Sequence, residues 1–320
     1  MISEFELISR YFKQLHTTAG VSVGIGDDAA LVEAFCTGYR VVCSDMLVEN
    51  RHFFSDDEPY DVGWKSLAVN LSDIAAMGAT PHQALLSIAL PKADTLWLAN
   101  FSTGFFECAK AYNVHLIGGD TTCGPLTVSV TAVGHVEKPV LLRKNAQIGD
   151  TIWVSGKIGM AALGLQIRKD KLSVSEDLKV DCLKELYHPI PRIDLGLKLA
   201  EFAHAAIDIS DGLLADLTHI LRASTVGARV SLDALITLDS RFAQIDDTVL
   251  LHAICHGGDD YELCFTTDPA DDDKVITLAN EMDLTLTPIG RIMDVPGLVT
   301  CIADVPLEIE GHGFDHFLDN

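Results

Sequence analysis

Basic residues are scarce in this sequence. Lysine and arginine number 23 against 46 aspartates and glutamates, so the 320-residue chain carries a formal net charge of -23 at pH 7. Nucleic acids and anionic membranes are bound through basic surfaces, and the charge balance therefore argues against both as partners. An acidic protein can still bind phosphate groups where metal cations lie between its carboxylates and the phosphate oxygens.

Long apolar runs and paired cysteine motifs are also missing. No stretch approaches the roughly 20 apolar residues of a membrane-spanning helix. The opening MISEFELISRYF is charged throughout, so we expect no secretory signal. The eight cysteines are scattered and form no CxxC, which favours reduced thiols over a disulfide framework or a zinc site. These absences predict a cytoplasmic protein.

The common phosphate-binding and nucleophile motifs are absent as well. The sequence has no GxxxxGK[ST], and the nearest fragment, VSGKIG at 154–159, lacks the first glycine at the required spacing. It also has no protein-kinase H-R-D set and no GxSxG elbow. Any use of ATP would therefore depend on carboxylate-held metal and not on a P-loop.

Apolar periodicity alternates between strand and helix along the whole chain. This alternation predicts an α/β (α+β) protein of two domains, 1–137 and 150–320, joined by a linker at 138–149 that is rich in basic and turn residues. The polar stretch 169–181 is expected to be a surface excursion. The predicted strands are 39–48, 82–90, 114–122, 126–136, 151–155 and 205–209, and the predicted helices are 3–16, 59–79, 93–112, 159–168, 176–187, 192–203 and 211–225.

Aspartates recur beside glycines at predicted strand ends and helix starts. Each one alone is explained by a turn or a helix cap. Several in one cleft would repel one another unless cations neutralised them, and carboxylate oxygens suit Mg²⁺ or Ca²⁺. We therefore expect a metal cleft that binds phosphate, with N–H groups of glycine turns on the phosphate oxygens. The aspartates are Asp27 and Asp28 in GIGDDAALV, Asp45 in CSDM, Asp73 in NLSDIAAMG, Asp120 in IGGDTT, Asp208 and Asp211 in AIDISDGLLADL, and Asp259 and Asp260 in GGDDYEL.

A few other residues allow more than one interpretation. His52 is either a ligand, a phosphate contact or an ordinary packed histidine. Arg143 and Lys144 either contact a phosphate or are solvated charges of the linker. His312 and His316 have zinc-like spacing, but the glycines around them argue against the helix that such a site needs.

Seven segments together resemble the thiamine-monophosphate kinase family. They are GIGDDAALV, SDMLVENRHF, AVNLSDIAAMGATP, LIGGDTTCGP, IDISDGLLADL, GGDDYELCF and GHGFDHF, and they follow the family order from residue 5 to 317. The wider superfamily includes aminoimidazole ribonucleotide synthetase, selenophosphate synthetase and a hydrogenase-maturation protein. The resemblance implies ATP-dependent phosphorylation of thiamine monophosphate to thiamine diphosphate. It also implies an N-terminal ATP-binding sheet that pairs across a homodimer, and a C-terminal α/β domain.

The resemblance also implies roles for individual residues. Mg²⁺ ions would be held by Asp28, Ser44, Asp45, Asp73, Asp120, Asp208 and Asp211. ATP would contact Gly119, Asp120, Arg143 and Ser210, and thiamine monophosphate would contact His52, Asp259 and Phe314. No catalytic base is implied, because a phosphate monoester with a second pKa of about 6 is already anionic at neutral pH. We therefore expect direct in-line transfer assisted by metal.

Two residues depart from the family pattern. Cys43 stands where the family usually has Ser or Thr, and because a thiol is a poor Mg²⁺ ligand, any contact there is expected through the backbone carbonyl. Asp259 stands where the family commonly has Glu, so its carboxylate is one methylene shorter.

Two rival functions stay open at this point. One is another ATP-using enzyme of the superfamily. Selenophosphate synthetase would need a reactive Cys in a glycine-rich N-terminal segment, and the first cysteine here is Cys36; the hydrogenase-maturation relative carries a terminal cysteine, and this chain ends FLDN. The other rival is a non-enzymatic module that binds Mg²⁺ or nucleotide, which would bind ATP without acceptor-stimulated release of ADP.

Overall fold

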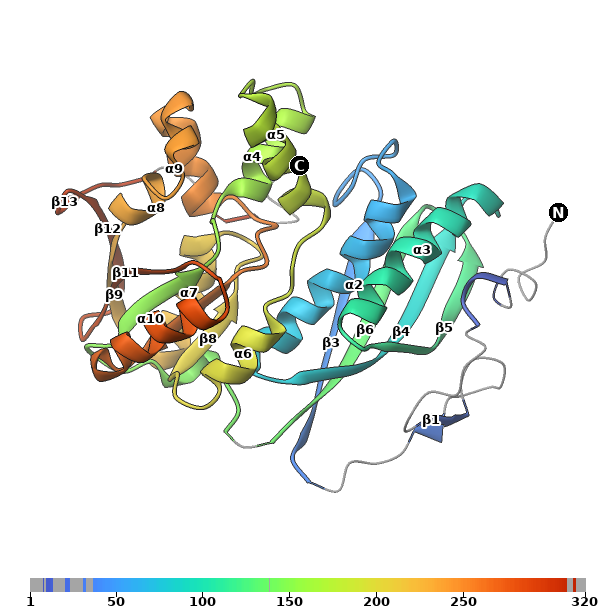
Figure 1. Ribbon diagram of the computed structural model, residues 1–320, viewed down its shortest axis with the longest axis horizontal. Coiled ribbons are helices and arrows are strands. Elements are labelled where there is room, and N and C mark those ends of the chain that lie inside the picture. The colour runs from blue at the N-terminus through green and yellow to red at the C-terminus, as the bar shows by residue number, and fades with distance from the viewer. Residues whose placement is uncertain are drawn as a thin grey trace. The chain divides into compact units, whose positions relative to one another are not determined.

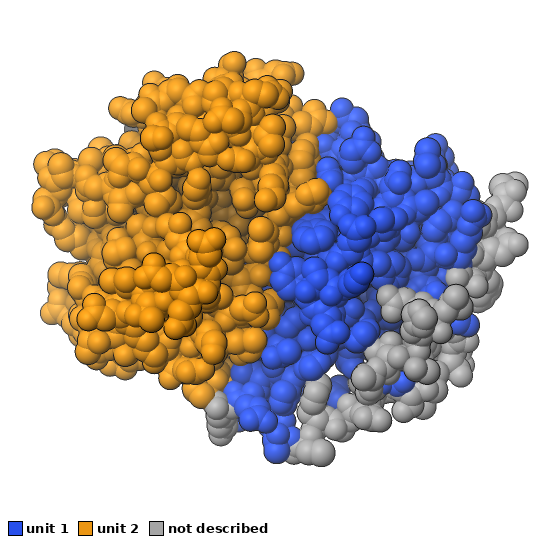
Figure 2. Space-filling view, in the orientation of Figure 1, with its two compact units in different colours: residues 1–74, 79–138 blue, residues 75–78, 139–320 orange. Residues whose placement is uncertain are grey.

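The computed structural model describes residues 8, 10–13, 21–23, 31–32, 37–137, 139–309 and 313–314 (Figure 1). The chain divides into two compact units (Figure 2). The first comprises residues 1–74 and 79–138, and the second comprises residues 75–78 and 139–320. Each unit combines a β-sheet with helices, which confirms the predicted α/β (α+β) class.

The first unit contains a four-stranded mixed sheet in the order β3-β6-β4-β5. Strand β6 pairs antiparallel with both β3 and β4, whereas β4 and β5 are parallel. Two helices lie on one face of this sheet (Figure 1). The bounds are β3 Tyr39–Val48, α2 Pro59–Ala76, β4 Thr80–Leu90, α3 Thr95–Ala111, β5 His115–Cys123 and β6 Thr127–Val136; β1 Val21–Val23 and β2 Leu31–Val32 form a separate antiparallel pair.

The alternating sequence TVSVTAVGHV explains which face of β6 is buried. Its valines and alanine at even positions lie under the helices, while the threonines and serine between them stay partly exposed. On the opposite face the side chains of Val42 and Met46 are 61% and 54% exposed. No described helix of the first unit covers this face, which we call the uncovered face.

The second unit is built on a seven-stranded sheet in the order β13-β12-β9-β11-β7-β10-β8. All neighbours are antiparallel except the parallel pair β9 and β12. The strands are β7 Thr151–Ser155, β8 Ala205–Asp208, β9 Gly227–Ser231, β10 Leu263–Thr267, β11 Leu286–Met293, β12 Gly297–Ile302 and β13 Val305–Pro306. The α-helices are α4 Met160–Arg168, α5 Glu176–Tyr187, α6 Ile193–Leu199, α7 Leu213–Ser224, α8 Asp233–Ile236, α9 Asp247–His256 and α10 Asp272–Glu281, and the short 3₁₀ helices are η1 Arg143–Asn145, η2 Ser240–Gln244 and η3 Pro269–Asp271.

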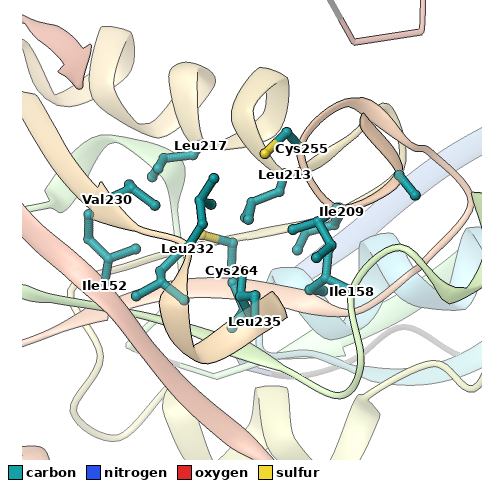
Figure 3. Close-up of a cluster of buried hydrophobic side chains, with 14 of the residues drawn as sticks. Ile152, Ile158, Ile209, Leu213, Leu217, Val230, Leu232, Leu235, Cys255 and Cys264 are labelled. Atoms are coloured by element: carbon teal, nitrogen blue, oxygen red, sulfur yellow. The ribbon is translucent and has the colours of Figure 1, made fainter. Parts of the chain in front are cut away.

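A hydrophobic core fills the second unit around the centre of this sheet (Figure 3). Strands β7, β8 and β10 are buried along their whole length, so both of their faces are covered. Residues 139–149 belong to this unit, and Leu141 and Ala146 are buried in it. Among the described helices, none is both long enough and apolar enough to cross a membrane.

The observed elements follow the predicted ones closely in the central part of the chain. Strand β3 has the predicted bounds, and most other elements differ from prediction by one to four residues at an end. The stretch 169–181 lies mostly on the surface, as expected, and Leu178 is its one buried residue. Helix α5 has the predicted bounds. The seven described cysteines are free thiols, and five of them are buried.

Candidate functional site

In the first unit, two of the predicted metal ligands lie beside one thiol. Asp45 on β3 and Asp73 on α2 both raise the pKa of Cys43 through their negative charge. Asn70, one turn before Asp73, accepts the Asp45 main-chain N–H on its side-chain oxygen at 3.1 Å, and its carbonyl accepts the Cys43 thiol at 3.2 Å. The structure therefore brings Asp45 and Asp73 together, with Asn70 tying the edge strand to the helix.

The chemistry of Cys43 argues against a thiolate ligand at this position. Burial, followed by the charges of Asp73 and Asp45, holds the pKa of the thiol well above its ordinary value. The thiol therefore stays protonated at neutral pH. The Asp45 main-chain N–H donates to Asn70 and therefore points away from β6. Backbone groups two residues apart on a strand point in the same direction, so the Cys43 carbonyl also points away from β6.

Ser44 and Asp120 lie on the other side of the sheet. The Ser44 hydroxyl is 3.0 Å from that of Thr131 and donates to the Val130 carbonyl at 3.1 Å. Asp120 pairs in register with Ser87 on the uncovered face, and Gly119 lies level with Asp45. Three strand spacings separate β5 from β3, roughly 14 Å. In the described chain, Ser44 and Asp120 therefore do not join Asp45 and Asp73.

Two of the aspartates predicted at strand ends lie inside their strands instead. Asp45 lies inside β3 and Asp120 lies inside β5. Gly119 also has a packing explanation, since it has a φ of +145° and a Cβ there would lie 1.7 Å from the Leu86 carbonyl oxygen. A side chain at this position would clash with β4, whatever the ligand.

His52 is held in one tautomer. Its Nδ1 accepts the main-chain N–H of Val48 at 2.9 Å, and its own main-chain N–H donates to the Val48 carbonyl at 3.0 Å. A ring nitrogen that accepts a hydrogen bond carries no proton, so in the neutral ring the proton is on Nε2. The half-buried ring therefore carries its N–H donor on Nε2.

In the second unit, a strand-to-helix turn carries three of the predicted residues. β8 ends at Asp208, which is 5% exposed, and α7 begins after Gly212. Ser210 and Asp211 lie between them, and both donate their main-chain N–H groups, at 3.0 Å each, to one oxygen of Asp216. Two successive N–H groups on one carboxylate oxygen fix the backbone of this turn.

Asp216 is the residue that the sequence analysis missed. It lies on α7 and is 3% exposed. Burial, followed by the charge of Asp208, raises the pKa of Asp216 to about 7, although the two N–H groups act in the opposite direction. One signal in the sequence could have identified it. Asp216 falls on the apolar stripe of α7, where an acidic residue must have an internal partner.

The GGDDYEL segment pairs with the same turn. The Asp259 N–H donates to the Ser210 carbonyl at 2.9 Å, and the Phe314 N–H donates to the Asp211 carbonyl at 2.9 Å. The structure therefore brings five of the predicted residues together, from three segments far apart in the sequence. They are Asp208, Ser210, Asp211, Asp259 and Phe314.

The inward side chains of GGDDYEL anchor it to the rest of the second unit. Asp260 accepts the Gly159 N–H at 2.8 Å and the Ala161 N–H at 3.4 Å, so the start of α4 already holds a carboxylate. Glu262 accepts hydrogen bonds from the Ser155 hydroxyl and from Nε and Nη2 of Arg192. The fragment VSGKIG at 154–159 is thus bound to these two acidic side chains, which gives it a structural role.

The remaining predicted residues are placed less directly. Arg143 is exposed on η1, and its carbonyl accepts the hydroxyl of Ser224 at the far end of α7 from the turn. The structure does not bring its main chain next to Ser210. Asp27, Asp28, His312 and His316 lie outside the described residues.

The donor sets on both units suit a hard divalent cation. Within the described part of the chain, no group of three His, Cys, Asp or Glu side chains is arranged to hold a metal ion. The carboxylates come instead as Asp45 with Asp73, and as Asp208 with Asp211. Mg²⁺ is commonly bound by one or two carboxylates together with substrate phosphates and water, so these pairs fit Mg²⁺ with a phosphorylated ligand.

Comparison with known proteins places the chain among related sequences and structures. Two family models match, AIR synthase related protein N-terminal domain over residues 26–136 and its C-terminal domain over residues 147–301. The thiamine-monophosphate kinase of Salmonella typhimurium is 40% identical over 318 residues, which cover 98% of each chain. A crystal structure of thiamine-monophosphate kinase from Stenotrophomonas maltophilia is 44% identical with a TM-score of 0.82, covering 88% of this chain and 91% of that one. AaThiL complexed with AMPPCP and TMP is 28% identical with a TM-score of 0.76, covering 99% of this chain and 97% of that one.

The two hydrogen bonds to Asp216 predict a stability difference between two uncharged variants. Asp216→Asn keeps an oxygen acceptor, whereas Asp216→Ala leaves the buried N–H groups of Ser210 and Asp211 without one. Because an unsatisfied buried donor costs on the order of 1–3 kcal/mol, the Ala variant should be less stable than the Asn variant by about that amount. Urea unfolding without divalent cations at pH 7.5 measures the difference.

The exposed N-cap Asp246 provides the control, since its carboxylate also accepts two N–H groups. Water can replace that acceptor, so the corresponding Asn and Ala variants at Asp246 should differ by about 1 kcal/mol or less. Equal stability of the two Asp216 variants would mean that this side chain does not hold the turn.

Proposed function

The chain belongs to the thiamine-monophosphate kinase family, and we propose that it transfers the γ-phosphoryl group of ATP to thiamine monophosphate. The products are thiamine diphosphate and ADP. The observation that carries this proposal is similarity over nearly the whole chain, 40% identity across 98% of both proteins. The similar protein AaThiL is complexed with AMPPCP, an ATP analogue, and with TMP, which supports both substrates.

Carboxylates on both units are the proposed metal ligands. We assign Asp45 and Asp73 in the first unit and Asp208 and Asp211 in the second, together with Ser44, Asp120 and Asp28 from the family pattern. Mg²⁺ bound to these groups would neutralise phosphate charge and hold the reacting oxygens in line. The oxygen-only side-chain donors support Mg²⁺ over a softer metal, and the protonated Cys43 thiol would take no part.

The chain's own groups would orient the two substrates. Gly119, Asp120, Arg143 and Ser210 are assigned to ATP. His52 can donate from Nε2 to a phosphate oxygen of the acceptor, because its Nδ1 is already occupied by the Val48 N–H.

Asp259 and Phe314 offer a negative charge and an aromatic ring for the organic part of thiamine monophosphate, which carries a thiazolium cation and a flat pyrimidine. Both residues donate their main-chain N–H to the turn that carries Ser210 and Asp211, so these two acceptor residues lie beside Ser210, which is assigned to ATP.

We also propose a homodimer in the cytoplasm. The uncovered face exposes apolar side chains at Val42, Met46 and Leu85, the last 37% exposed, which is unusual for a surface in contact with water alone. A second copy packed there would also lie next to Ser44 and Asp120, the two predicted site residues that face away from Asp45. The free thiols support a reducing compartment.

The proposed kinase activity predicts ADP release that depends on thiamine monophosphate. Asp73→Asn and Asp208→Asn should each lower kcat by about 100-fold or more, because each removes a charge that holds a cation at the transferring phosphoryl group. A coupled ADP assay at saturating Mg²⁺ measures this. Asp94→Asn, at the N-cap of α3, is the control and should keep normal turnover. Near-normal activity of either site variant would contradict its assignment.

Direct transfer predicts that no phosphorylated enzyme forms. The acceptor phosphate is already a nucleophile at neutral pH, and no described side chain is assigned as a covalent relay. Rapid quenching of the enzyme with γ-labelled ATP, into acid and into base, should leave the protein unlabelled with and without thiamine monophosphate. A labelled protein that forms and decays as fast as turnover would overturn the direct mechanism.

The proposed dimer predicts that a charge on the uncovered face dissociates the protein. Met46→Lys should convert a dimer into a monomer, because two lysines would be brought into an apolar interface. Sedimentation analysis at micromolar protein gives the mass. Val180→Lys, at a 57% exposed position on α5, is the control and should stay dimeric. A monomeric native protein, or a dimeric Met46→Lys variant, would contradict the proposal.

A further inference from the structure

The segment 258–262 has two faces with different contacts. Asp260 and Glu262 point inward, where they accept hydrogen bonds from the start of α4 and from Arg192. Asp259 and Tyr261 alternate with them. Their main-chain N–H groups donate to the carbonyls of Ser210 at 2.9 Å and Ile209 at 2.8 Å, which fixes the backbone on both sides of Asp260.

Asp259 and Tyr261 both have left-handed backbone conformations. The φ of Asp259 is 70° and that of Tyr261 is 50°. An aspartate tolerates this region, but a bulky aromatic residue adopts it rarely, and such residues persist only where surrounding contacts impose the conformation.

The two side chains are joined by a hydrogen bond. The Tyr261 hydroxyl donates to Oδ1 of Asp259 at 3.0 Å, and the tyrosine is 9% exposed while Asp259 is half-buried. A phenol that donates to a carboxylate restricts the rotation of the carboxylate. Tyr261 itself is packed in the protein, so it supplies a fixed donor.

We propose that Tyr261 is a positioning residue for thiamine monophosphate, which it serves by holding the Asp259 carboxylate in one orientation. This inference rests on the proposed function, since it assumes that Asp259 contacts the acceptor. It also explains how the shorter side chain of Asp259 can contact thiamine monophosphate at a position where the family commonly has glutamate. An aspartate has less freedom to adjust its reach, so a fixed orientation matters more for it.

A double-mutant cycle tests the proposal. Tyr261→Phe removes one oxygen atom and keeps the ring. It should raise the KM for thiamine monophosphate about 10-fold, with kcat and the KM for ATP within about 2-fold of the native values. Asp259→Asn provides the second background, because asparagine tolerates the positive φ at this position. In that background Tyr261→Phe should raise the KM for thiamine monophosphate by less than about 2-fold, because the carboxylate that Tyr261 positions is absent.

Tyr60→Phe is the matched control, since the Tyr60 hydroxyl also donates to a carboxylate, that of Glu107, in the first unit. It should leave the KM for thiamine monophosphate unchanged. An unchanged KM in Tyr261→Phe would overturn the inference, as would equal increases in the KM values of both substrates or additive effects in the cycle. A native enzyme without acceptor-dependent ADP release would instead refute the proposed function itself.

Discussion

Mutual repulsion between carboxylates is the constraint around which the candidate site is built. Asp208 and Asp216 are both buried and close enough for the charge of one to raise the pKa of the other. Such an arrangement is unfavourable unless hydrogen-bond donors or cations offset it. Two main-chain N–H groups offset part of it at Asp216, and under the proposed function a bound cation would offset the remaining negative charge. In the first unit, Asp45 and Asp73 lie beside the protonated Cys43 thiol, and Asn70 accepts hydrogen bonds from that thiol and from the Asp45 main-chain N–H.

The sequence predicted the fold well because periodicity is a direct readout of burial. Strand β3 was predicted with its observed bounds, since YRVVCSDMLV lies between turn-forming segments and has the length of a strand. The relative positions of the acidic residues are harder to predict, because neighbours in the sequence need not lie on the same face of a strand. Ser44 and Asp45 are neighbours in the chain, yet successive side chains of a strand point to opposite faces. Their separation follows from the same alternation that identified the strand.

The parts of the site that the sequence could not supply depend on contacts between distant segments. The pairing of GGDDYEL with the turn at residues 209–211 joins positions about fifty residues apart, and no local pattern specifies it. The position of Asp216 in the apolar stripe of α7 indicates a buried acidic residue. The sequence does not indicate which groups form hydrogen bonds with it. Asp28, the residue of the first glycine loop, lies outside the described residues, so its predicted role stays a prediction.

The alternation within residues 258–262 also bears on how this enzyme class can diverge. Asp260 and Glu262 are committed to the scaffold, because α4 and Arg192 depend on them. Asp259 and Tyr261 are joined to each other by a hydrogen bond, so a substitution at either residue removes that bond from the other. The two positions are therefore expected to covary among related enzymes, while the residues between and after them stay constant.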